Sequence, residues 1–146
     1  MPYEHRITRR VEFSETDMAG IVHFSNFFRY FEAVEHDFYR SLGFSIDARD
    51  QGLGWPRVEA TCSYRAPLRF EDVFEVWLLV AERRERSVRY HFVIRRGEVE
   101  VARGGMTTVC VRRDGQGQMR STPIPEPVAA KIEPAPAEAL ERAGLA

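Results

Sequence analysis

The chain has 146 residues, of which 44% are hydrophobic and 29% charged, a composition typical of one globular domain. Its formal net charge of −1 excludes nucleic-acid binding that depends on an overall basic field. With only two cysteines, no secretory signal pattern and no apolar run of spanning length, the sequence predicts a cytoplasmic protein without a membrane span. No CxxC or HExxH spacing occurs, so we expect no metal site.

Residues 4–13 have the β-branched and aromatic side chains of a strand, and a turn follows at residues 15–21. A long helix is expected to begin near Asn26, with Ser25 as its N-cap and Gly43 at the stop position. Apolar residues at three- and four-residue spacing form one stripe on it: Phe24, Phe27, Phe28, Phe31, Val34, Phe38 and Leu42. A stripe so rich in phenylalanine favours a helix wrapped by a sheet.

Strand-like runs follow the helix at residues 57–64, 73–81, 88–95 and 99–111. The second run is strongly apolar, as expected for a strand covered on both faces. The last contains Gly104 and Gly105, where we expect a bend or bulge. A helix followed by strands joined through short turns predicts the α+β class with a mainly antiparallel sheet.

We assign residues 1–125 to one domain and residues 126–146 to a Pro/Ala-rich tail, with a short helix near 137–143 or no fixed structure.

The turn before the helix contains the first candidate catalytic residue, Asp17. A carboxylate at this place lies beside the free N–H groups of a helix N-terminus, which suits chemistry at a carbonyl carbon. An ionised aspartate can act there as a general base or as a nucleophile. The alternative is an Asx-turn or a capping role, which is common for aspartate before a glycine-containing turn.

Two further candidates, His23 and Phe24, follow at the expected start of the helix. The backbone N–H of Phe24 is suited to polarising a carbonyl oxygen. His23 either packs or caps the helix, or it brings a polar group to the reacting carbonyl, where it would also suit dehydration of a 3-hydroxyacyl thioester. Further along the helix, Glu35 falls within the apolar stripe and needs a partner. Three alternatives follow for Glu35: it lines a pocket, it pairs with a residue across a subunit boundary, or this part of the helix is exposed to water.

The segment 83–87 is a charged turn between two strands. Such charge runs usually form a solvated hairpin end. The functional alternative is a contact to the phosphates of a charged carrier molecule, because arginine binds phosphate well. Arg120 would join such a contact if the fold brings it near.

Residues 11–33, VEFSETDMAGIVHFSNFFRYFEA, resemble the N-terminal signature of the hot-dog-fold 4-hydroxybenzoyl-CoA thioesterase family. That family includes the acyl-CoA thioesterases associated with the Tol–Pal system. The resemblance covers roughly residues 5–125 and implies a long central helix wrapped by a curved antiparallel sheet of about five strands. It also implies homodimers whose sheets join edge to edge, often paired into homotetramers, with an active site between two subunits.

The resemblance implies roles for particular residues. Asp17 matches the family's catalytic aspartate, and the Phe24 N–H matches the donor that binds the thioester oxygen. His23 departs from the family, which has an aromatic residue at that position. The expected substrate and CoA contacts are Gly20, Asn26, Arg84, Arg86, Ser87 and Arg120.

The function implied by the resemblance is hydrolysis of acyl-CoA or aryl-CoA thioesters to free acid and CoA. Coenzyme A is then part of the substrate, and no further cofactor is expected. The residues do not separate an acyl from an aryl group. Two alternatives stay open: a hot-dog 3-hydroxyacyl-thioester dehydratase or hydratase, and a non-catalytic acyl-CoA binding module.

Overall fold

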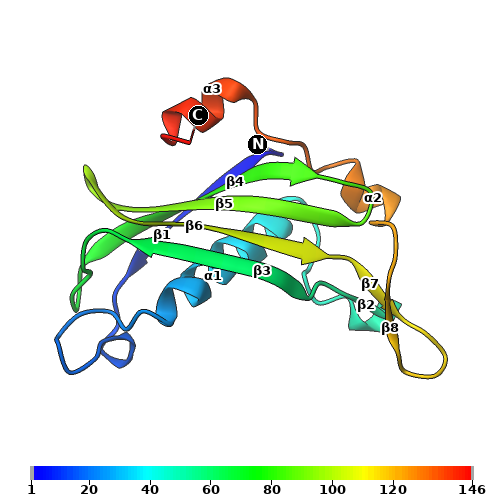
Figure 1. Ribbon diagram of the computed structural model, residues 1–146, viewed down its shortest axis with the longest axis horizontal. Helices are drawn as coiled ribbons and strands as arrows, with labels where there is room; N and C mark the ends of the chain where they lie inside the picture. The colour runs from blue at the N-terminus through cyan, green and yellow to red at the C-terminus, as the bar shows by residue number, and fades with distance from the viewer. Residues whose placement is uncertain (1, 146) are drawn as a thin grey trace.

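The computed structural model describes residues 2–145 and packs one long helix against an antiparallel sheet (Figure 1). The sheet has five strands in the order β1-β4-β5-β6-β3, and every neighbouring pair is antiparallel. The strands are β1 (Glu4–Arg10), β3 (Arg57–Tyr64), β4 (Val73–Arg83), β5 (Ser87–Arg96) and β6 (Val99–Val109). The predicted α+β class and sheet are therefore confirmed.

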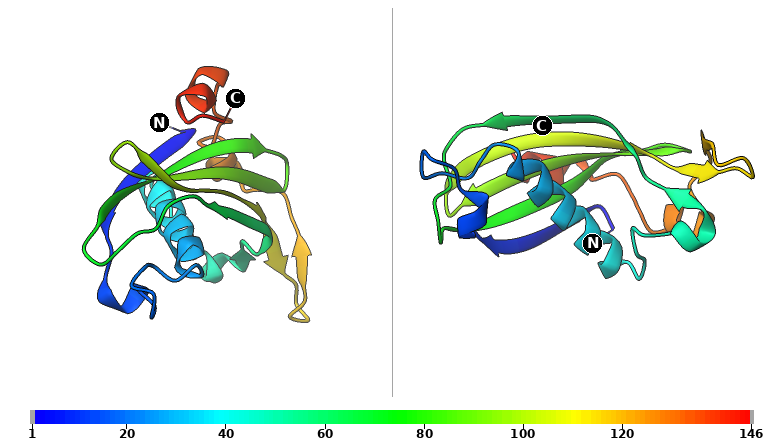
Figure 2. Two further views of the ribbon diagram at one scale, coloured as in Figure 1. Left: turned by 60° about the vertical axis from the view of Figure 1, so that its left-hand side comes forward. Right: turned by 90° about the horizontal axis from the view of Figure 1, so that it is seen from below.

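The long helix α1 (Asn26–Ser41) lies in the concave face of the curved sheet (Figure 2). Its end is as predicted: Gly43 has φ 89°, and its N–H donates to the Arg40 carbonyl at 3.0 Å. Its start differs in one respect. Ser25 occupies the N-cap position but makes no side-chain capping bond, because its hydroxyl is bonded to Nδ1 of His23 at 2.8 Å.

β6 passes close to α1 at Gly104. A Cβ atom at this position would lie 2.6 Å from the Phe31 ring, and it would also collide with the Thr61 carbonyl of β3. Strand pairing continues through Gly104 and Gly105 without a register shift. A bulge at this point, one of the two predicted features, is therefore wrong, and glycine is required here by the close approach of the helix.

The C-terminal segment packs on both faces of the sheet: Val128 and Ile132 join the core around α1, whereas residues from Ala135 to Leu145 contribute to a cluster on the outer face (Figure 1). It contains the short helices α2 (Glu126–Ala129) and α3 (Ala137–Arg142). An apolar cluster joins α3 and its C-terminal flank to β4 and β5: Trp77, Leu79, Val93, Ala139 and Ala143. β4 is therefore buried on both faces, as its apolar sequence predicts.

The remaining elements are short. β2 (Leu53–Gly54), β7 (Val111–Arg113) and β8 (Met119–Ser121) form a second sheet in that order. Two single turns of 3-10 helix are η1 (Phe13–Glu15) and η2 (Arg49–Gln51). None of the helices within residues 2–145 has the length and apolar character needed to cross a membrane.

Candidate active site

A cavity of about 520 Å³ opens beside the turn that precedes α1. Its walls come from that turn, from the first turn of α1 and from the end of β3, and include Asp17, Phe24, Phe27, Tyr64 and Arg65. The fold thus places a carboxylate, a helix N-terminus and aromatic side chains around one opening. Apolar walls beside a few polar groups are typical of small-molecule sites.

Asp17 is held in a tight turn. The Ala19 N–H donates to Asp17 Oδ1 at 2.9 Å, and the Gly20 N–H donates to the Asp17 carbonyl at 2.9 Å. Gly20 has φ 80°, a conformation that other residues rarely adopt, so the turn requires glycine at this position. The Asx-turn considered from the sequence is therefore present. Within residues 2–145 no hydrogen bond reaches Asp17 Oδ2, which leaves one carboxylate oxygen available in the cavity.

The turn is anchored to the loop before β4. The Val22 N–H donates to the Leu68 carbonyl at 2.8 Å, and Ile21 pairs with Arg69 in an isolated β-bridge. These main-chain contacts do not depend on the side chains of the turn. The main chain on the C-terminal side of Asp17 is therefore held in place by backbone contacts.

The Phe24 N–H forms no hydrogen bond within residues 2–145. It lies just before α1, where the first N–H groups of a helix have no intrahelical acceptor. The Tyr64 hydroxyl donates to the Phe24 carbonyl at 3.2 Å and so ties the helix start to β3. A free N–H donor and a carboxylate on one cavity can hold a carbonyl group from two sides.

His23 faces the start of the helix. Its Nδ1 accepts the Ser25 N–H at 3.3 Å and lies 2.8 Å from the Ser25 hydroxyl, which therefore donates to it. The ring packs on Phe24, with 4.6 Å between ring centroids. His23 is absent from the side chains that line the Asp17 cavity. This geometry corresponds to the capping alternative.

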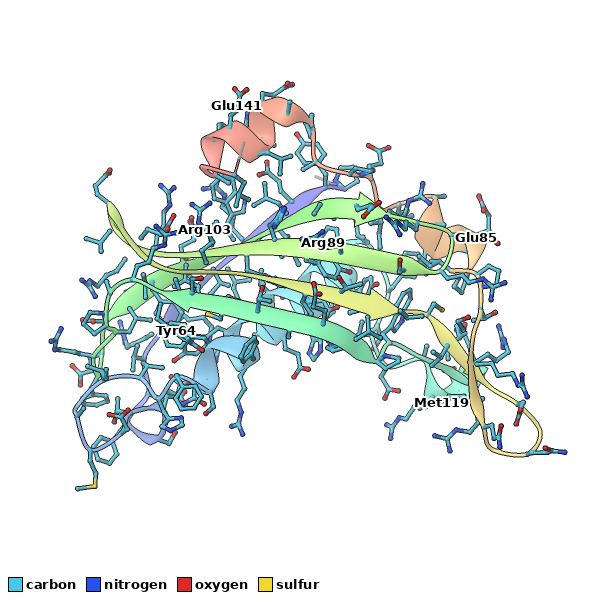
Figure 3. The ribbon with its side chains drawn as sticks, in the orientation of Figure 1. Tyr64, Glu85, Arg89, Arg103, Met119 and Glu141 are labelled. Carbon is cyan, nitrogen blue, oxygen red and sulfur yellow. The ribbon has the colours of Figure 1, made fainter. Side chains whose placement is uncertain are left out.

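The predicted CoA-binding turn lies at the other end of the sheet. Arg84 and Arg86 belong to the connection between β4 and β5, and Ser87 is the first residue of β5. Figure 3 shows Glu85 of this connection at one end of the sheet and Tyr64, which lines the Asp17 cavity, at the other. One chain therefore does not bring these residues together with Asp17.

Arg86 and Arg120 do lie in neighbouring segments. The Arg86 guanidinium donates to the carbonyl of Ser121 at 2.8 Å, and Arg120 is the preceding residue in β8. Two of the arginines already have carboxylate partners, since Arg84 Nε lies 2.7 Å from Glu82 and Arg120 Nε lies 3.5 Å from Asp114. Such surface pairs contribute little to stability.

Residues 11–132 match the family described as the thioesterase-like superfamily. The chain belongs to this superfamily. It is 40% identical over 117 residues to a putative esterase from Aquifex aeolicus (strain VF5), covering 80% of this chain and 89% of that protein. It is 29% identical over 126 residues to the 4-hydroxybenzoyl-CoA thioesterase of Pseudomonas sp. (strain CBS-3), with the same coverage of 80% and 89%.

The solved structure of a gentisyl-coenzyme A thioesterase has a TM-score of 0.76 to this thioesterase-like protein. The two are 30% identical, and the match covers 84% of this chain and 98% of the other. The predicted hot-dog fold and the predicted family are confirmed by these comparisons. The predicted enzyme class, a thioesterase, is confirmed at the level of the family.

Among the cavity residues that sequence reasoning missed, Tyr64 and Arg65 are the ones with polar groups. Both come from the end of β3 and belong to no motif. Arg65 is more than half exposed, and its Nε pairs with Glu100 at 2.9 Å. The sequence feature that could have located them is an aromatic residue next to a basic residue at the end of a predicted strand.

Glu35 finds its partner within the same chain of this thioesterase-like protein. It is fully buried on α1, and the Arg57 guanidinium at the start of β3 donates a hydrogen bond to its Oε1. Burial raises the pKa of Glu35 to about 7, against the opposing effect of Arg57, and Glu32 raises it further. Its second oxygen, Oε2, has no hydrogen-bond partner within residues 2–145.

We expect Glu35 to make the free energy of unfolding fall as the pH rises from 4.5 to about 7. In this window the folded chain still holds the proton that the unfolded chain has released, so a rise in pH favours unfolding. The effect is at most roughly 3 kcal/mol, because each pKa unit corresponds to about 1.4 kcal/mol. Urea unfolding at several pH values should show this dependence for the wild type and much less of it for Glu35→Gln. If the free energy of unfolding depended on pH equally in the two proteins, the raised pKa of Glu35 would be contradicted.

Proposed function

We propose that this protein hydrolyses acyl-CoA or aryl-CoA thioesters to the free acid and CoA. The observation that carries the proposal is the cavity at the start of α1, which is lined by Asp17 and Phe24, and the Phe24 N–H has no hydrogen-bond partner within residues 2–145. The names of the relatives support the same reaction class. Two of them are thioesterases of 4-hydroxybenzoyl-CoA and gentisyl-CoA, which supports the aryl class in particular.

In the proposed reaction, the thioester carbonyl oxygen accepts the Phe24 N–H. Asp17 takes a proton from water, and the hydroxide adds to the carbonyl carbon. Collapse of the tetrahedral intermediate breaks the C–S bond, and the CoA thiolate leaves and is protonated. Asp17 can instead attack the carbonyl itself, forming an anhydride that water then opens. In both routes the N–H and the positive end of α1 stabilise the oxyanion, and one such donor typically contributes 10²–10³-fold in rate.

We further propose that the complete site belongs to a homodimer. β3 is the last strand of the main sheet, so one of its edges has no neighbouring strand within residues 2–145. Antiparallel pairing with β3 of a second copy would bring opposite ends of the two sheets together. The partner's turn with Arg84 and Arg86 would then lie at the end that holds Asp17. A homotetramer and a cytoplasmic location stay predictions from the sequence.

The proposal is tested with a panel of acyl- and aryl-CoA esters and detection of the free thiol. We expect catalytic release of CoA, and a dimer or larger assembly in analytical ultracentrifugation. Interconversion of 3-hydroxyacyl and enoyl thioesters without CoA release would support the dehydratase alternative. Binding of CoA esters without turnover would support the binding-module alternative, and either result would overturn the proposed hydrolysis.

A further inference from the structure

Asn26 joins the two segments that hold the candidate catalytic groups. Its Nδ2 donates to the main-chain carbonyl of Glu15 at 2.9 Å in a partly buried contact. The same carbonyl oxygen accepts the His23 N–H at 2.9 Å. Glu15 lies two residues before Asp17, while His23 and Asn26 flank the dipeptide that begins with Phe24. The Glu15 carbonyl oxygen therefore joins the two ends of the loop that contains the Asp17 carboxylate and the Phe24 N–H.

Glu15 is itself firmly held. Its N–H donates to the Glu12 carbonyl at 3.0 Å, and its Oε1 accepts the Glu12 N–H at 2.8 Å. Its other carboxylate oxygen lies 3.9 Å from the Arg9 guanidinium. Burial and the neighbouring Glu15 carboxylate raise the pKa of Tyr30 well above its usual range, so this neighbour stays neutral. The Glu15 carbonyl is thus a fixed point from which the start of α1 can be positioned.

Asn26 does not line the Asp17 cavity, although its position in the sequence suggested a substrate contact. We propose that Asn26 is a positioning residue, whose carboxamide sets the separation between the Asp17 carboxylate and the Phe24 N–H. This inference rests on the proposed function. The loop has an independent anchor in the bond from Val22 to Leu68, so the loss of Asn26 should shift the loop without unfolding it.

The test compares Asn26→Ala with wild type on the CoA ester that wild type hydrolyses fastest. We expect kcat to fall by about 10²-fold, because a misplacement of about 1 Å has an effect of this size. KM should change by less than about threefold, since binding is left intact in a positioning variant. Thr16→Val is the matched control, because it removes a bond within the same loop, from Thr16 Oγ1 to the Phe13 carbonyl, and leaves α1 untouched. Its kcat should stay close to wild type.

Asn26→Asp provides a second readout. Its ionised carboxylate would repel the Glu15 carbonyl, whereas the protonated form would regain a donor. The ratio of kcat for Asn26→Asp to kcat for Asn26→Ala should therefore rise as the pH falls. A raised KM with unchanged kcat in the alanine variant would instead mean a substrate contact, and would overturn the proposal.

A readout without turnover separates this inference from the proposed function. The His23 N–H shares its acceptor with Asn26, so hydrogen exchange across residues 15–26 should accelerate in Asn26→Ala and stay unchanged in the main sheet. Unchanged exchange would overturn the inference whether or not the protein hydrolyses thioesters. A wild type that releases no CoA would overturn the proposed function, even where the exchange data show that Asn26 holds the loop.

Discussion

Asp17→Asn is expected to lower kcat for CoA thioester hydrolysis by about 10³-fold, the loss typical of removing an essential acid–base group. The asparagine side chain has the same shape, and its Oδ1 can still accept the Ala19 N–H that Asp17 accepts at 2.9 Å. It cannot take a proton from water or attack a carbonyl. Release of CoA, followed by thiol detection under saturating substrate, measures the loss.

The matched control for this variant is Asp47→Asn. Asp47 also accepts a main-chain N–H two residues ahead, from Arg49 at 3.2 Å, but it lies outside the Asp17 cavity. We expect its kcat to equal that of wild type, and thermal unfolding of the Asp17 variant to match wild type as well. If Asp17→Asn kept the kcat of wild type, the Asp17 carboxylate would not take part in catalysis.

The elements of the fold could be predicted because local periodicity defines them. The strand at residues 57–64 has the bounds predicted from its sequence, and Gly43 ends α1 in the expected conformation. Gly104 shows the limit of this reasoning. A glycine within a strand indicates either a bulge or a close approach by another element, and only the packing of Phe31 distinguishes the two.

The candidate site could be predicted only where it is contiguous in the sequence. Asp17 and Phe24 lie in one turn and the helix start that follows it, so a single motif locates both. Tyr64 reaches the same cavity from a strand some 40 residues later, a placement that depends on sheet order. Arg84 lies at the far end of the sheet, so a role for it at Asp17 requires the proposed homodimer, which the family resemblance implies but residue spacing does not reveal.

The need of Glu35 for a partner could also be predicted, since a buried carboxylate without one is costly. The identity of that partner could not, because Arg57 lies 22 residues away on an edge strand. An ion pair between the middle of α1 and the start of β3 also helps to fix where the helix lies along the sheet. Helix position matters for the site because the first turn of α1 contributes to the cavity wall.

Gly104→Ala tests the helix position most directly. The added methyl group would meet the Phe31 ring at 2.6 Å and the Thr61 carbonyl, and neither can move without shifting α1 or β3. Overpacking of a filled core costs 1–3 kcal/mol and occasionally more, and we expect a loss of about 3 kcal/mol in the free energy of unfolding. Urea unfolding measures the loss, with Gly105→Ala as the control.

In the control variant, a Cβ atom at Gly105 meets its nearest neighbour, the Tyr90 carbonyl oxygen, at 3.3 Å, so small adjustments suffice. Its stability should stay within about 1 kcal/mol of wild type, because restricting the unfolded chain offsets part of the crowding. Equal stability of both variants would mean that β6 and α1 can separate at little cost. The helix start would then have a loosely defined position, and the approach of the Phe24 N–H to Asp17 would depend on the local bonds of the loop, among them those that the Glu15 carbonyl accepts from Asn26 and His23.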